Sequence, residues 1–152
     1  MTAMSAPRSR PPRLGGPVAP AAVNLLEQAR RGLQEAAELP VPADRYAAAH
    51  LAALRASAAV LAARAQATDL RARRRRPTSA WVLLTAVAPE LGEWAAFFAA
   101  GAGKRAAAEA GVQHAVTSRE ADDLVRDVQT FLALVETTLG LLPGPRLAAL
   151  AG

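Results

Sequence analysis

Apolar residues recur at intervals of three and four along four segments of the chain, and prolines separate the first three of these segments. Such spacing places the apolar side chains on one face of an α-helix, and that face has to pack against another helix. The first segment covers residues 21–39 and ends at Pro40 and Pro42, which cannot continue a helix. The pattern therefore predicts helices that pack together.

The second predicted helix begins after Asp44, which can cap its amino end, and ends between Thr68 and Arg76. Its predicted buried seam combines small residues with leucines: Ala47, Leu51, Leu54, Ala58, Leu61 and Ala65. The third helical segment opens at residues 77–79, with Thr78 or Ser79 as its cap, and its apolar side extends from Trp81 to Phe98. Because Pro89 lies inside this segment, we expect a kink or a break there.

The fourth segment has the clearest helix start. Thr117 and Glu120 have the spacing of a capping box, in which each side chain hydrogen-bonds the backbone N–H of the other residue. An apolar stripe follows over residues 121–139, and Gly140 and Pro143 end the helix. Four helices with short connections make an all-α four-helix bundle the expected architecture.

Composition agrees with this fold class and excludes several kinds of function. Alanine, the best helix former and a poor strand former, is the main apolar residue. The chain has no cysteine, which excludes disulfide frameworks, thiolate metal sites and thiol nucleophiles. No spacing of histidine and acidic residues indicates a metal site, so we expect neither metal nor cofactor.

The predicted organisation has three parts. A basic, proline-rich leader over residues 1–19 is expected to be disordered, because its composition cannot form a core. The helical bundle covers residues 20–142, and a flexible tail covers residues 143–152. The apolar stretches at residues 80–88 and 95–103 fall short of the roughly 20 residues of a membrane span. We therefore expect a cytoplasmic protein without a membrane segment.

Positive charge is concentrated in the first half of the chain. Residues 1–76 hold thirteen arginines and five acidic residues, whereas residues 77–152 hold five basic and eight acidic residues. The predicted nucleic-acid-binding residues are the densest cluster and one upstream arginine: Arg64, Arg71, Arg73, Arg74, Arg75 and Arg76. Such a cluster can neutralise several phosphates and release their counterions. The alternatives are a docking site for an acidic protein partner and a solvated loop without a specific role.

Three segments resemble HEPN domains, bundles of four or five helices named for higher eukaryotes and prokaryotes nucleotide binding. Residues 45–56 (RYAAAHLAALRA) resemble the second HEPN helix, and residues 116–127 (VTSREADDLVRD) resemble the last one. Residues 89–98 (PELGEWAAFF) are similar to a small actinobacterial HEPN-like branch. The resemblance implies a metal-independent ribonuclease, a toxin–antitoxin component or a non-catalytic nucleotide or RNA binder, and it implies a homodimer.

The nuclease members of this family place a histidine four to six residues after an arginine, usually late in the domain. Arg45 and His50 satisfy this spacing in the second helix, with Tyr46 where a polar residue is usual. Five residues of helix rotate by about 140°, so the two side chains diverge. We interpret His50 as a histidine at the bundle edge and Arg45 as a solvent-exposed arginine, because Arg45 lies nearly opposite the leucine seam.

Two adjacent aromatic residues bear on oligomeric state. Phe97 and Phe98 cannot face the same way on a helix, so one of them is expected to be exposed and to mark a dimer surface. Together these observations favour a non-catalytic binding or adaptor module associated with nucleic acid or nucleotide. The alternatives are a dimeric, metal-independent endoribonuclease that uses Arg45 and His50, and a protein–protein interaction module.

Overall fold

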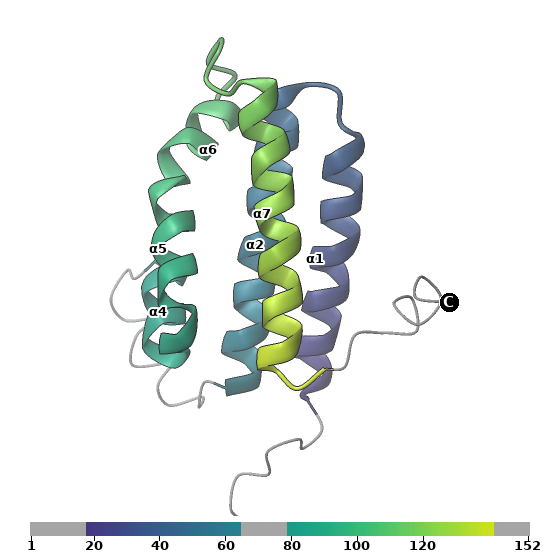
Figure 1. Ribbon diagram of the computed structural model, residues 1–152, viewed down its shortest axis with the longest axis vertical. Coiled ribbons are helices and arrows are strands. Elements are labelled where there is room, and N and C mark those ends of the chain that lie inside the picture. The colour runs from purple at the N-terminus through teal and green to yellow at the C-terminus, as the bar shows by residue number, and fades with distance from the viewer. Residues whose placement is uncertain (1–17, 65–78, 142–152) are drawn as a thin grey trace, which may run out of the picture.

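Three long helices and three shorter ones form the bundle (Figure 1). The computed structural model describes residues 18–64 and 79–141. The long helices are α1 (Pro20–Glu38), α2 (Pro42–Arg64) and α7 (Ser118–Thr138). The shorter helices are α4 (Ala80–Val87), α5 (Gly92–Ala100) and α6 (Ala102–Glu109), and a 3₁₀ turn (Pro89–Leu91) joins α4 to α5. These described residues contain no strand, so the predicted all-α bundle is confirmed.

The helix starts follow local capping chemistry. The Thr117 N–H donates to Glu120 Oε1 at 3.1 Å, and the Glu120 N–H donates to Thr117 Oγ1 at 3.1 Å, which confirms the capping box. Ser79 caps α4 by accepting from the Val82 N–H at 3.2 Å. The prediction for Asp44 is wrong. Helix α2 begins two residues earlier, at Pro42, because proline fits the first turn of a helix.

Pro89 breaks the third helical segment as expected. It begins the 3₁₀ turn between α4 and α5, where its missing N–H leaves no helical hydrogen bond unmade. The chain beyond this break stays helical through α5 and α6, although Gly101 separates the two helices. The 3₁₀ turn reverses the direction of the chain, so α4 lies alongside α5, and the Trp81 ring stacks on the Phe98 ring with centroids 5.0 Å apart.

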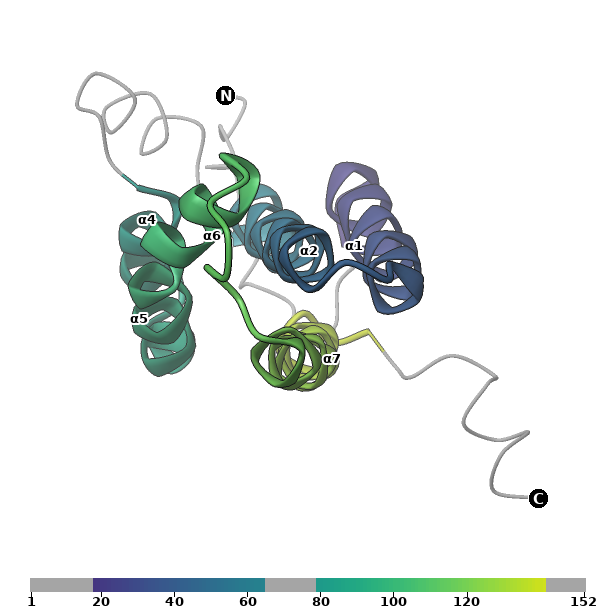
Figure 2. The ribbon, with the colours of Figure 1, turned by 90° about the horizontal axis from the view of Figure 1, so that it is seen from above.

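Helix α2 lies at the centre of the bundle, between α1, α7 and the helices α4 and α6 (Figure 2). Ten of its 23 residues are therefore buried, and the apolar ones among them are mostly alanines: Tyr46, Ala49, Ala52, Ala53, Ala56, Ala59 and Val60. The predicted leucine seam is wrong. Leu51 is 42% exposed, and Leu54 and Leu61 are only partly buried. Alanine faces the neighbouring helices because its small side chain lets their backbones approach closely.

The central position of α2 also explains its composition. By length and composition alone α2 could cross a membrane, with a mean hydropathy of 1.3 over 18 residues. Half of that stretch is buried inside the bundle. A helix with neighbours on several sides needs apolar residues around most of its surface, and α2 has them for that reason.

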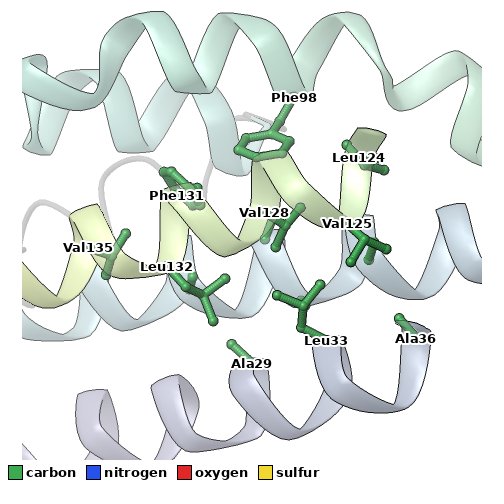
Figure 3. Packing of buried hydrophobic residues seen from close by; sticks show 14 of the residues in the cluster. Ala29, Leu33, Ala36, Phe98, Leu124, Val125, Val128, Phe131, Leu132 and Val135 are labelled. Atoms are coloured by element: carbon green, nitrogen blue, oxygen red, sulfur yellow. The ribbon is translucent and has the colours of Figure 1, made fainter. Parts of the chain in front are cut away.

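Helix α7 joins the two sides of the core (Figure 3). Phe131 lies against Phe98 of α5, with ring centroids 4.9 Å apart, whereas Leu132 lies toward Leu33 of α1. All four side chains are at most 6% exposed. The predicted stripe of α7 is buried from Ala121 to Val135, and the predicted stripe of α1 is buried from Leu26 to Ala36. One helix thus connects the aromatic side of the core to the aliphatic side.

Several expectations fall outside the described residues. These are the disordered leader up to residue 17, the tail from residue 142 and the continuation of the second helix beyond Arg64.

Candidate functional site

The α1–α2 connection, α6 and the start of α7 meet at one end of the bundle (Figure 1). Helix α2 brings Arg45, Tyr46 and His50 to this end. Helix α6 contributes Lys104, and α7 contributes Glu120 near its amino end. Residues far apart in the sequence therefore form the surroundings of the predicted Arg45–His50 pair.

The Arg45 guanidinium is buried and committed to contacts within the fold. Its Nη1 donates to the Leu39 carbonyl at 2.7 Å, and its Nη2 donates to Ser118 Oγ at 3.0 Å. Its Nε also lies 3.0 Å from Asp122 Oδ1, an ion pair without hydrogen-bond alignment. Arg45 is only 8% exposed, so the interpretation as a solvent arginine is wrong. The start of α7 covers this side of α2, which the sequence of α2 does not indicate.

His50 is also buried, at 1% exposed, and is not at the bundle edge as interpreted from the sequence. Its Nε2 lies 3.0 Å from the Phe98 carbonyl. Because a carbonyl only accepts hydrogen bonds, this contact assigns the proton of a neutral imidazole to Nε2. The Trp81 and Phe98 rings pack edge-on around the imidazole, with centroids 5.8 and 6.0 Å away.

The protonation state of His50 follows from this environment. Burial lowers the pKa of His50 below its usual value, since a charged imidazolium would lose its hydration. The Phe98 carbonyl opposes this shift by favouring the charged form, and the positive charge of Arg105 lowers the pKa further. His50 is therefore neutral at neutral pH and donates one hydrogen bond to α5.

This burial predicts that acid destabilises the fold. The unfolded His50 binds a proton near pH 6.5, while the folded one resists it, so the free energy of unfolding falls as pH drops from about 7.5 to 5.5. The contribution is complete above the unfolded pKa and is lost as pH falls toward the lower folded pKa. Urea midpoints at several pH values measure the slope.

A pair of glutamine variants isolates the residue. His50→Gln keeps an N–H donor but does not titrate, so it should flatten this part of the profile. His114→Gln, in an exposed loop position, is the matched control for the substitution itself. An unchanged slope in His50→Gln would contradict a buried, neutral histidine.

Arg45 and His50 do not converge within the chain. Arg45 contacts Leu39 and the start of α7, whereas His50 contacts α5. The two side chains point to different neighbours because five residues of helix separate them by about 140°. In the positions where the described residues hold them, the Arg45 guanidinium and the His50 imidazole of one chain cannot contact the same phosphate.

A pocket of about 240 Å³ lies next to this pair, between α2, α5, α6 and α7. We name it the Tyr46 pocket. Its lining residues are mostly aromatic or small: Tyr46, His50, Phe97, Phe98, Ala100, Gly101, Lys104 and Leu124. Phe97 is 46% exposed and Phe98 is 1% exposed, which confirms that one of the two adjacent rings is exposed. The exposed ring lines the pocket, a role that sequence reasoning missed.

Gly101 permits the close approach of α6 to Tyr46. A Cβ atom on residue 101 would lie 2.9 Å from the Tyr46 hydroxyl oxygen and 3.8 Å from His50 Cδ2. The first distance is too short for a real contact. The two glycines that precede Lys104 mark this position in the sequence, but no nearby residue indicates that Tyr46 is its neighbour in the fold.

We expect Gly101→Ala to lower the free energy of unfolding by about 1 to 2 kcal/mol, because the new methyl group displaces the Tyr46 hydroxyl. In a Tyr46→Phe background the same change should be neutral or stabilise by up to about 1 kcal/mol, since residue 101 has ordinary helical dihedral angles. Thermal and urea denaturation of the four proteins measure the coupling. An equal cost in both backgrounds would exclude the contact.

Of the predicted nucleic-acid-binding arginines, only Arg64 lies within the described residues. Arg64 pairs with Glu90, and its Nη2 donates to the Thr138 carbonyl at 3.4 Å. It thus connects the end of α2 to the 3₁₀ turn and to the end of α7. The other five arginines, at positions 71 and 73–76, lie outside the described residues.

A larger groove of about 680 Å³ lies between α1 and α7. Arg30 Nε donates to Glu136 Oε1 at 2.7 Å, so the two charged groups that link its walls satisfy each other. None of the predicted site residues lines this groove. Among the described residues there is also no cluster of three histidine, aspartate or glutamate side chains that could hold a metal ion.

A family model described as SAV_6107-like HEPN matches residues 36–136, more than half of the chain. The matched segment includes Arg45, His50 and every lining residue of the Tyr46 pocket. Searches of the curated proteins and of the solved structures find no match to the chain.

Proposed function

The chain belongs to the HEPN family, and from this membership we propose that it is a non-catalytic binding module for nucleic acid or nucleotide. HEPN domains include nucleotide-binding proteins and ribonucleases. The choice between these two functions depends on what Arg45 and His50 do.

The observation that carries the proposal is the burial of Arg45. RNA cleavage through a 2′-hydroxyl needs a cationic group at the phosphate and a general acid or base at the hydroxyl. Arg45 instead donates hydrogen bonds to the Leu39 carbonyl and the Ser118 hydroxyl and pairs with Asp122. Its guanidinium could reach a phosphate only if the start of α7 separated from α2. His50 donates its Nε2 proton to the Phe98 carbonyl. Both groups have structural partners that substrate would have to displace.

The hypothesis of nucleic-acid binding is based on the arginines at positions 71 and 73–76. Five positive charges in six residues neutralise RNA phosphates without reading the bases. If all five contact phosphates of a single strand, raising salt from about 50 to 200 mM should weaken binding about 100-fold. The counterion effect therefore gives the proposal a measurable magnitude.

We expect the purified chain to bind labelled single-stranded RNA in a salt-dependent way and to leave it intact. Fluorescence anisotropy at the two salt concentrations measures binding, and a denaturing gel of the same samples with EDTA measures cleavage. The double variant Arg74→Glu/Arg75→Glu should weaken binding at least tenfold at low salt, because it reverses two charges of the cluster.

The matched control is Arg31→Glu/Arg119→Glu, which changes the net charge equally at two exposed positions outside the cluster. Equal losses in both variants would show a general charge effect and contradict a site at the cluster. Cleavage in EDTA that disappears in a folded His50→Gln variant would favour the dimeric ribonuclease instead. Absence of both binding and cleavage would overturn the proposal and favour a protein-interaction module.

A further inference from the structure

We propose that the Tyr46 pocket binds a small aromatic carboxylate, with the ring inside the pocket and the acid at Lys104. This proposal concerns a different part of the molecule from the arginine cluster and does not depend on nucleic-acid binding. It rests on the size of the pocket, the chemistry of its walls and the arrangement of one ion pair at its mouth.

The pocket is large enough for a substituted ring. An apolar cavity of about 150 Å³ accommodates benzene, and the Tyr46 pocket measures about 240 Å³. Phe98 and Leu124 supply buried apolar wall, while Phe97 remains 46% exposed. The Trp94 ring packs edge-on against Phe97, with centroids 6.0 Å apart, and supports it in this position. A bound aromatic ring would cover apolar surface that water now contacts.

The polar groups of the pocket are few and differ in depth. None of the described residues hydrogen-bonds the Tyr46 hydroxyl, which lies close to Gly101 and is available to a ring substituent. His50 presents its Cδ2 edge toward Gly101, and its Nε2 proton is used by the Phe98 carbonyl. Lys104 is the only charged residue among the described lining residues, so a single anionic group matches the pocket.

The ion pair at the mouth leaves Lys104 able to change partners. Glu120 uses Oε1 to accept the Thr117 N–H of the capping box and Oε2 to pair with Lys104. Its carboxylate is therefore fixed by the start of α7, whereas Lys104 has this one ion-pair partner among the described residues. Both side chains are 38% exposed, and exposed pairs of this kind contribute little stability. A ligand carboxylate can take the ammonium group without breaking the helix cap.

Two probes of the same shape test the charge. 4-Hydroxybenzoate carries the acid and a hydroxyl for Tyr46, and 4-hydroxybenzamide is its neutral counterpart. For a ligand of this size we expect a Kd of about 1 mM for the acid and binding about tenfold weaker for the amide. Amide chemical shifts titrated in two-dimensional NMR spectra locate the site, with shifts expected at Tyr46, Phe97 and Gly101.

Two variants should change acid binding in opposite directions. Lys104→Met should weaken it about tenfold, to the level of the amide. Glu120→Gln keeps a capping side chain but removes the competing charge, so it should tighten acid binding severalfold. Arg119→Met removes a charge from an exposed position that does not line the pocket and should leave the Kd unchanged.

Each contrary result overturns the proposal. Absence of shifts at the pocket residues up to about 10 mM of the acid would show that the pocket takes no such ligand. Equal binding of acid and amide, or equal effects of Lys104→Met and Arg119→Met, would exclude recognition by Lys104. Backbone spectra of each free variant establish that it is folded before the titration.

Discussion

Replacing Phe98 with alanine is expected to lower the free energy of unfolding by about 3 to 5 kcal/mol. Phe98 is 1% exposed and contacts five other aromatic rings, including the His50 imidazole, and its loss leaves a cavity where α4, α5 and α7 meet. For a domain of this size the change corresponds to a fall in Tm of roughly 10 to 20 °C. Thermal denaturation followed by circular dichroism measures it.

Phe97 provides the matched control for this prediction. It is the same residue type, one position earlier on the same helix, but 46% exposed. Phe97→Ala should cost only about 1 kcal/mol, because half of the ring already contacts water. Similar losses from the two substitutions would mean that α5 is rotated relative to the described packing, and the Tyr46 pocket would then lose its exposed wall.

The second large effect is expected at Arg45. Arg45→Ala should lower the free energy of unfolding by about 2 to 4 kcal/mol, since it leaves the Leu39 carbonyl and the Ser118 hydroxyl without their donor. Arg45→Lys should recover only part of this loss, because an ammonium group cannot reproduce the planar, multidentate geometry of a guanidinium. Urea denaturation measures the three proteins.

Arg55 is the control on the same helix. It is half-buried and makes no ion pair with another described residue, so Arg55→Ala should change stability by no more than about 0.5 kcal/mol. The comparison also bears on function. A catalytic arginine held for substrate would show a large loss of RNA cleavage with little loss of stability, whereas the described contacts predict the reverse.

Much of the fold followed from the sequence because its signals are local. Pro89 interrupts the third helical segment, and Thr117 with Glu120 starts the last helix, since each effect depends on residues within one turn. The stripes of α1 and α7 were also predicted well. In both helices polar residues occupy the opposite face, so the apolar positions identify the buried side.

Helix α2 shows where such reasoning fails. Apolar residues lie around most of the helix, so their spacing could not identify the buried face. The predicted seam, which contains Leu51, indicated the wrong face. The face of α2 that packs closely against the neighbouring helices carries alanines such as Ala49 and Ala53, because only small side chains fit there. The bulkier leucines lie where the packing is looser. The resulting rotation of α2 is what buries Arg45 and His50.

The sequence by itself determined the fold class, the break at Pro89, the start of the last helix, the family resemblance and the position of the charge cluster, because these depend on neighbouring residues or on composition. Only the tertiary structure decided the states of Arg45 and His50. Their partners Ser118 and Phe98 lie 73 and 48 residues away, and a buried polar group takes its role from the acceptors that packing brings to it. The Tyr46 pocket has the same origin, since helices α2, α5, α6 and α7 form it together.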